Sequence, residues 1–338
     1  MATSKHRVVA RLGFAALLIV TVVLAAGMRR GDVPRVTVLT WNIFDGVADF
    51  TGPPDMEQLW HGENATRFGE RADSIAQIIA EQHPHIICLQ EVAHWRGLIL
   101  LDLYNHNFLA MLQQRLVALG LHYDIVGMLE TINFYSQFDS GGTFPSTLRW
   151  RENVVILARQ STQIEVSNVR TRSFDDTFTI SSPSHSLEFQ RGWIAADISY
   201  RGKRARYVCT HLEPRSSSVR QDQAAQLIDW LSGTGLPVVV MGDMSSLPGG
   251  AVHTQFTDAG YQDAWAAIHG LQAGPTCCQS PDLMNSTSEL DKRNDYVFLR
   301  GALTPVSISR VGQNQSDRTP GGLWPSDHAG LVAHIGLE

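Results

Sequence analysis

Polar residues of the kinds that bind metal ions and move protons stand at the ends of several apolar segments in this 338-residue chain. Each segment has the length of a β-strand. Taken singly, each polar residue is explained as well by solvation of a strand end or by turn formation. Because strand ends along one edge of a sheet converge, the set as a whole predicts a site on a rigid scaffold. Its members are Asn42, Glu91, His211, Asp243, Asp295, Asp327 and His328.

These residue types favour one kind of chemistry. Carboxylates and an amide suit a hard divalent cation such as Mg²⁺ or Mn²⁺. Such an ion neutralises phosphate oxygens, and a histidine stabilises or protonates what remains. The chain has no GxSxG, HExxH or GxxxxGK[ST] motif, which argues against a serine-hydrolase elbow, a zinc-protease helix and a P-loop. Metal-assisted phosphoester hydrolysis is the class that fits best.

The elements that must position these residues are mostly strands. Apolar segments of strand length recur at residues 36–41, 86–89, 154–157, 192–198, 206–210, 238–241, 296–299 and 331–335. Periodicity predicts helices over 64–82, 107–119 and 218–231, and polar composition predicts loops over 45–62, 131–147 and 171–189. No repeat or long linker divides residues 35–338, so we expect a single α/β sandwich domain there.

The strings around the polar residues resemble, in order and spacing, the endonuclease/exonuclease/phosphatase (DNase I-like) superfamily. They are TWN at Thr40, LQEV at Leu89, THLE at Thr210, GD at Gly242, DYVF at Asp295 and SDH at Ser326, supported by RENVVILAR around Asn153 and RQDQ at Arg220. The resemblance spans about residues 36–336. It implies a four-layer α/β sandwich, with two mixed sheets face to face and helices outside.

The resemblance implies a metal side of the site. Asn42 and Glu91 match positions that help to hold the ion, and Glu91 matches its principal ligand. Asp327 matches a further carboxylate on the same side. The expected cofactor is therefore Mg²⁺, with Mn²⁺ as the alternative.

The resemblance also implies a phosphate side. Asp243 matches the acid that orients or deprotonates the attacking water, and His211 matches a phosphate-contacting histidine. His328 matches the imidazole that meets the phosphoryl group. Asp295 matches the acid that fixes the tautomer and orientation of that imidazole, as a partner carboxylate does in general.

Two positions depart from the family pattern. The family usually reads GDFN where this chain reads GDMSS, so Ser245 stands in place of a phosphate-contacting asparagine. A hydroxyl keeps a donor but loses the reach of an amide, which puts catalytic efficiency in doubt. Asn294 replaces an apolar residue before Asp295, and we expect this to change packing only.

The first thirty residues differ from the rest of the chain. They carry five basic and no acidic residues around an uncharged stretch at 12–28, which is typical of an export signal or a membrane anchor. We expect export, and favour a retained anchor over a cleaved signal peptide. The whole chain has a net charge of −6, so the remainder carries −11 and has no overall attraction for a polyanion.

The four cysteines are too few for a disulfide scaffold. Cys88 and Cys209 lie in apolar runs and are interpreted as small buried hydrophobic residues. The adjacent Cys277 and Cys278 are either two free thiols or a vicinal disulfide.

Three functional hypotheses follow. The leading one is an exported, metal-dependent phosphoesterase acting on a lipid head group or a small phosphodiester. A secreted or membrane-tethered DNase I-like endonuclease is the alternative, and it requires a basic, aromatic-lined groove at the site. The third is a phosphate-binding protein on a catalytically inactive fold, for which Ser245 is the only direct support.

Overall fold

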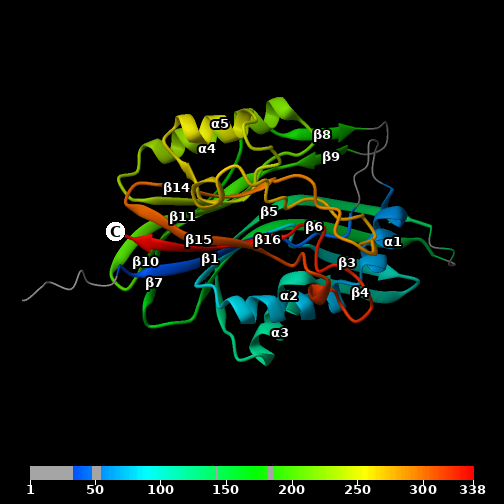
Figure 1. Cartoon of the computed structure of the whole chain (residues 1–338). Helices are drawn as coiled ribbons and strands as arrows, with labels where there is room; N and C mark the ends of the chain where they lie inside the picture. Colours follow the sequence, from blue (N-terminus) through cyan, green and yellow to red (C-terminus); the bar gives the residue numbers. More distant parts are fainter. Residues whose placement is uncertain (1–32, 48–54, 140, 142–143, 182–185) are drawn as a thin grey trace, which may run out of the picture. The chain divides into compact units, whose positions relative to one another are not determined.

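The computed structural model describes residues 33–47, 55–139, 141, 144–181 and 186–338 (Figure 1). Val33–Glu338 form one compact unit. The predicted export or anchor segment at residues 1–30 lies outside the described part. Within the described residues, no helix is both long enough and apolar enough to cross a bilayer.

The first sheet is mixed, with β1 and β2 parallel and the other pairs antiparallel. Among the described residues its strands run in the order β15 (Leu303–Val311), β16 (Gly330–Leu337), β1 (Arg35–Asn42), β2 (Ile86–Gln90), β6 (Ser146–Arg159), β3 (His94–Ile99) and β4 (Asp102–Asn107), with β5 (Tyr123–Phe138) also paired to β6.

The second sheet is mixed in the same way, with β11 and β12 parallel. Its described strands run in the order β13 (Gln262–Asp263), β14 (Asp295–Arg300), β12 (Val238–Asp243), β11 (Lys203–His211), β10 (Gly192–Tyr200) and β7 (Ile164–Ser173). A separate hairpin joins β8 (Phe178–Ser181) to β9 (Ser186–Phe189).

The two sheets pack face to face with helices outside them, as Figure 1 shows. Helices α1 (Met56–Thr66), α2 (Phe68–Gln82) and α3 (Phe108–Ala118) share a core with the outer face of the first sheet. Helices α4 (Ser217–Ser232) and α5 (Ala251–Asp258) share one with the second sheet, and the short α6 (Ala264–His269) packs beside β14 and β15. A third core fills the space between the sheets. The predicted four-layer α/β sandwich is confirmed.

The eight apolar segments all form strands, and the helices predicted over 107–119 and 218–231 are α3 and α4. The helix predicted over 64–82 is wrong at its start, because Arg67 adopts the left-handed conformation and separates α1 from α2. The first of these helices begins inside the predicted loop 45–62, where the Asp55 carboxylate accepts from the amides of Glu57 and Gln58 and caps it.

The loops predicted over 131–147 and 171–189 are also mostly wrong. The first is largely the ends of β5 and β6, and the second contains β8 and β9. These strands expose much of their surface and therefore carry polar residues, which a composition argument interprets as loop.

The interpretation of Cys88 and Cys209 as buried is correct, but they are not free. They form a disulfide with a Cα–Cα distance of 5.4 Å, which joins β2 of one sheet to β11 of the other. Nothing local marks residues 121 positions apart as partners, so only the packing of the sheets reveals the bond. Cys277 and Cys278 form a vicinal disulfide.

Candidate active site

The site lies where one edge of each sheet presents its strand ends. The parallel strands β1 and β2 finish there with Asn42 and Gln90, and Glu91 follows directly. In the second sheet the parallel strands β11 and β12 finish there with the register pair His211 and Asp243. Antiparallel strands instead begin at this edge, so Asp295 at the start of β14 pairs with Asp243. The directions of the strands thus bring site residues that are distant in the sequence to one edge of each sheet.

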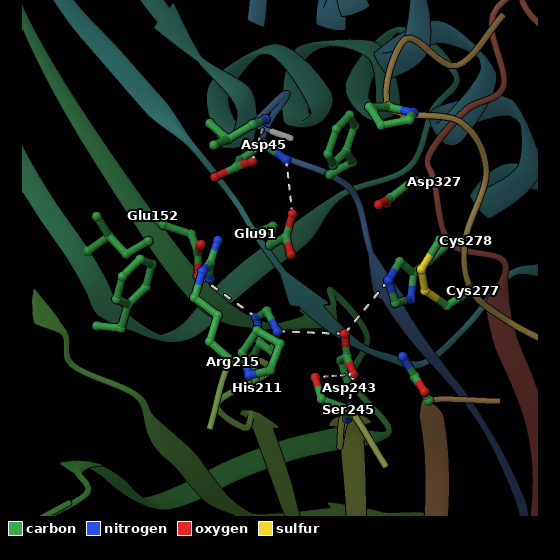
Figure 2. Close-up of a pocket in the computed structure, with 18 of the residues that line it drawn as sticks. Asp45, Glu91, Glu152, His211, Arg215, Asp243, Ser245, Cys277, Cys278 and Asp327 are labelled. Atoms are coloured by element: carbon green, nitrogen blue, oxygen red, sulfur yellow. Dashed lines mark hydrogen bonds and ion pairs between the residues drawn. A yellow bond between two sulfur atoms is a disulfide. The ribbon is translucent and has the colours of Figure 1, made fainter. Parts of the chain in front are cut away.

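A pocket of about 360 Å³ opens at this edge (Figure 2). Six of the predicted residues line it, namely Glu91, His211, Asp243, Ser245, Asp327 and His328. The other two lie directly behind these and bind them: Asn42 contacts Glu91, and Asp295 contacts His328. The structure therefore brings all eight predicted residues together.

His211 is held neutral. Its Nδ1 lies 3.1 Å from Nη1 of Arg191, which can only donate, so Nδ1 accepts and the ring proton sits on Nε2. Burial and the charge of Arg191 hold the pKa of His211 well below its usual range. The Nε2–H lies 3.6 Å from Oδ2 of Asp243 and is the hydrogen-bond donor that this ring offers.

His328, by contrast, is held protonated. Its Nδ1 lies 2.8 Å from Oδ2 of the fully buried Asp295. Although burial opposes protonation, the carboxylates of Asp295 and Asp327 hold the pKa of His328 well above its usual range. The ring is therefore an imidazolium with Nε2–H 3.7 Å from Oδ2 of Asp243.

Asp243 is a buried carboxylate between these two rings, as the dashed lines in Figure 2 show. Burial and the neighbouring Asp295 raise its pKa to about 6. Ser245 donates to Oδ1 from its backbone amide at 2.7 Å and from its hydroxyl at 3.1 Å. Ser245 has a φ of 47°, in the left-handed region. This serine therefore orients Asp243.

A cluster of acidic side chains lines the other part of the pocket: Asp45, Glu91, Glu152 and Asp327. Burial, Glu152 and Asp327 raise the pKa of Glu91 to about 8, and burial and Glu91 raise that of Asp45 well above its usual range. Concentrated negative charge of this kind favours a bound cation.

The donor set fits a hard divalent ion, because these groups offer oxygen only. Among the described residues, the groups of three potential ligands with their atoms within 4.8 Å are Asp243–Asp295–His328 and Cys277–Cys278–His328, so Glu91 and Asp327 belong to no closed cage. An open arrangement suits Mg²⁺, which takes one or two carboxylates and keeps several waters. Glu91 and Asp327, with Asp45 beside them, are the residues that would hold it.

Asn42 has a positioning role in this geometry. Its Nδ2 donates to Glu91 Oε1 at 2.8 Å and to Asp243 Oδ2 at 3.4 Å, while its Oδ1 accepts from the Phe44 amide at 3.0 Å. The amide thus links the acidic cluster to Asp243. Its assignment as a metal ligand stays a prediction.

Several residues of the site were not predicted. Glu152, within β6, accepts from Arg191 Nη1 at 2.6 Å and so ties this arginine to the acidic cluster. Arg71, fully buried on α2, donates to the backbone carbonyls of Ile43, Phe44 and Pro325 and so supports both loops that carry acidic ligands. Neither residue stands at a strand end. The RENV string around Asn153 was the one available signal for Glu152.

Asn294 lines the pocket, and the expectation that it changes packing alone stays a prediction. Its carbonyl accepts from the Met244 amide, next to Asp243. The vicinal disulfide of Cys277 and Cys278 forms another part of the wall, close to His328 (Figure 2).

The model of the Endonuclease/Exonuclease/phosphatase family matches residues 39–328, which include every residue of the site described above. This chain belongs to that family. No curated protein matches it in sequence.

Solved structures of the family share the fold. The endonuclease/exonuclease/phosphatase of Bacteroides vulgatus is 19% identical with a TM-score of 0.58, covering 90% of this chain and 100% of that one. The family protein of Leptotrichia buccalis is 18% identical with a TM-score of 0.58, covering 89% and 99%. D. rerio TDP2, solved with a single-strand DNA product, is 15% identical with a TM-score of 0.54, covering 89% and 98%. At these identities the likeness establishes the fold alone.

Proposed function

We propose that this chain is a divalent-metal-dependent phosphoester hydrolase, with Mg²⁺ as its ion. The observation that carries the proposal is the pair of one neutral and one cationic imidazole around Asp243, next to a cluster of buried carboxylates. An ion-pair network that only stabilises the fold does not require one neutral and one cationic histidine beside the same carboxylate in a pocket. Phosphoryl hydrolysis needs a base for water and donors for phosphoryl oxygens, and both are present.

The reaction follows from the charge states at neutral pH. Asp243, with a pKa of about 6, is mostly ionised, so it orients a water molecule and accepts its proton as the oxygen attacks phosphorus. His211 and the His328 imidazolium donate from Nε2 to the phosphoryl oxygens while the bond to the leaving oxygen breaks. A divalent cation held by Glu91 and Asp327 would supply further neutralisation of phosphoryl charge. Asp295 and Arg191 hold the two rings in the required tautomers.

For the substrate we favour a lipid head group or a small phosphodiester over duplex DNA. The net charge of −11 outside the first thirty residues opposes broad binding of a polyanion. The rival is a nuclease, because a single strand would require cations and aromatic rings at the site. Arg215 and Lys292 line the pocket, whereas Trp150 and Phe189 in its wall are almost fully buried. The D. rerio TDP2 structure with its DNA product gives this alternative a precedent on the fold.

The direct test is hydrolysis by the unit Val33–Glu338 of bis(p-nitrophenyl) phosphate, sphingomyelin and supercoiled plasmid, with Mg²⁺ and with EDTA. We expect EDTA-sensitive turnover. Glu91→Gln and Asp243→Asn should each lower kcat/KM about 10²- to 10³-fold. The matched controls are Glu81→Gln and Asp229→Asn, which change exposed acids on α2 and α4. Wild-type rates in both site variants would refute the assigned site.

The same experiment separates the alternatives. Cleavage of plasmid but not of sphingomyelin or the small diester would establish the nuclease. Binding of Mg²⁺ without turnover of any substrate would favour the binding-only protein.

We also propose that the protein is exported. The disulfide between Cys88 and Cys209 supports this, because such bonds form and persist mainly in oxidising compartments. It is independent of the basic and apolar pattern of residues 1–30, which supports the same conclusion.

A further inference from the structure

The tip of the β3–β4 hairpin exposes an unusual number of leucines. Leu98, Leu100, Leu101 and Leu103 are 48%, 53%, 70% and 69% exposed. Leu98 and Leu103 are register partners, so they stand side by side on one face, and the other two form the turn. These four residues are called the leucine tip below. A contiguous group of this kind marks an interaction surface more often than four scattered leucines would.

The turn itself is costly for leucine. Leu100 and Leu101 have φ values of 50° and 73°, the left-handed conformation in which two-residue hairpin turns take Asn and Gly. Both side chains point away from the core, so burial within the fold does not compensate for this conformation. Burial of these two side chains in an apolar environment outside the fold would compensate for it.

A pair of arginines lies next to the leucine tip on the same sheet. Arg96 and Arg149 are both exposed and are register partners on β3 and β6. Because side chains alternate between faces, Arg96 shares a face with Leu98. Like charges directly opposite destabilise a strand pair, and neither arginine has an ion pair with any residue that the structure describes. Tyr135, register partner of Arg149 on β5, is 50% exposed beside them.

The leucine tip lies at the active-site end of the sheet. Residue 94, where β3 starts, pairs with Arg151, the neighbour of Glu152 in the pocket. From there β3 runs away from the strand ends that form the site and reaches the tip about 15 Å farther on, at about 3.3 Å per residue. In Figure 1 the hairpin lies at the end of the fold opposite the C terminus.

We propose that this hairpin is a docking surface for an anionic lipid bilayer, with the leucine tip in the interface and Arg96 and Arg149 on the head groups. An apolar tip followed by cations is the order that a membrane interface requires from depth to surface. A second copy of this chain fits less well as the partner. A two-fold contact would bring the two arginine pairs together, and the area that four leucines can bury falls far short of the about 800 Å² that each partner buries in a stable interface. The docking surface does not depend on which phosphoester is hydrolysed.

The test is sedimentation of the unit Val33–Glu338, which lacks the predicted anchor, with phosphatidylcholine vesicles with and without 30% phosphatidylserine. Leu100→Asn with Leu101→Gly gives the turn its preferred residues, so this variant should fold at least as well as the wild type. We expect wild-type binding to the anionic vesicles and a loss of more than tenfold in the variant. Hydrolysis of a soluble diester should be unchanged.

Two further variants sharpen the result. Arg96→Gln with Arg149→Gln should remove the preference for anionic vesicles and the weakening of binding by salt. Leu119→Asn with Leu271→Asn removes two exposed leucines elsewhere and should bind as the wild type does. The proposal is overturned if wild-type protein stays in the supernatant or if the turn variant binds equally well. It is also overturned if the wild type is a dimer that the turn variant converts to a monomer.

Discussion

Two imidazoles flank one carboxylate in this site, and they differ in charge because their second partners differ. Arg191 donates to Nδ1 of His211 and excludes a proton there, whereas Asp295 accepts from Nδ1 of His328 and retains one. Both groups behind the rings are almost fully buried, so their charges are weakly screened. The partner groups of the two rings, Arg191 and Asp295, therefore determine what His211 and His328 can donate.

At this scale we predict the effect of Asp295→Asn. Removing the carboxylate lowers the pKa of His328, so the imidazolium is lost at a lower pH than in the wild type. We expect kcat to fall about 10²-fold with little change in KM, and the alkaline limb of the pH–rate profile to move to lower pH. The measurement is kcat against pH, with Asp258→Asn on α5 as the control. An unchanged alkaline limb would remove Asp295 from the mechanism.

The strands that carry the site are joined across the sandwich. Cys88 lies three residues before Glu91 on β2, and Cys209 lies two residues before His211 on β11. The disulfide thus connects the strand that leads to the acidic cluster with the strand that ends at His211. Its main contribution is to stability, since it closes a long loop in the unfolded chain.

We therefore predict that Cys88→Ala with Cys209→Ala lowers the free energy of unfolding by about 3–5 kcal/mol. Thermal or denaturant unfolding with and without reductant measures it. Cys277→Ser with Cys278→Ser is the control, because adjacent residues close no loop of consequence. Equal stability of the Ala variant and the wild type would show that the bond is absent from the folded protein.

A second prediction at this scale concerns His85, which joins α2 to β2. Its Nδ1 accepts from the Thr37 amide of β1 at 2.9 Å, and burial with the charges of Arg159 and Arg201 lowers its pKa to about 4. An unfolded chain takes up this proton near pH 6.5, so the stabilising effect of the neutral ring is present above pH 6.5 and is lost as pH falls towards 4. His85→Gln removes the ring. We therefore expect the difference in unfolding free energy between the wild type and this variant to become smaller as pH falls from 6.5 towards 4.

Denaturant unfolding of both proteins at pH 7.5, 6, 5 and 4.5 measures that gap. Gln114→Ala, a change of an exposed and uncharged residue on α3, is the control and should leave the gap independent of pH. A gap that is constant for His85→Gln as well would contradict the neutral, partly buried ring.

At the scale of the whole molecule, the prediction concerns the N-terminal segment that precedes the compact unit Val33–Glu338 in the sequence. We predict export with a retained anchor. Expression of the full chain, fractionation and N-terminal sequencing measure this: Met1 in the membrane fraction shows retention, and a start near Gly27 or Met28 shows cleavage. Replacing the basic residues Lys5, Arg7 and Arg11 by Gln should impair export, because they precede the apolar stretch. Finding the unmodified, full-length protein in the cytosol would refute export.

Much of the fold and of the site could be predicted from local patterns. Asn42, His211 and Asp243 end apolar strands and Glu91 follows one directly, and the carboxyl ends of parallel neighbours necessarily meet at one edge of a sheet. The four layers follow from the same alternation of buried strands and one-sided helices. A strand that is largely exposed, such as β5, has no such signature, and the prediction of a loop over 131–147 covers its second half.

Only the tertiary structure decided the contacts between residues that are distant in sequence and carry no local signal. Glu152 and Arg191 lie inside or beside strands, and Arg71 interrupts an apolar helix face; their partners come from other elements. The pairing of Cys88 with Cys209 and the charge states of the two histidines depend on the same packing. The sequence determined which residues reach the edge of each sheet, because the point where a strand ends depends on local sequence patterns. The face-to-face packing of the sheets determined which charges are buried together, and therefore what the site can do.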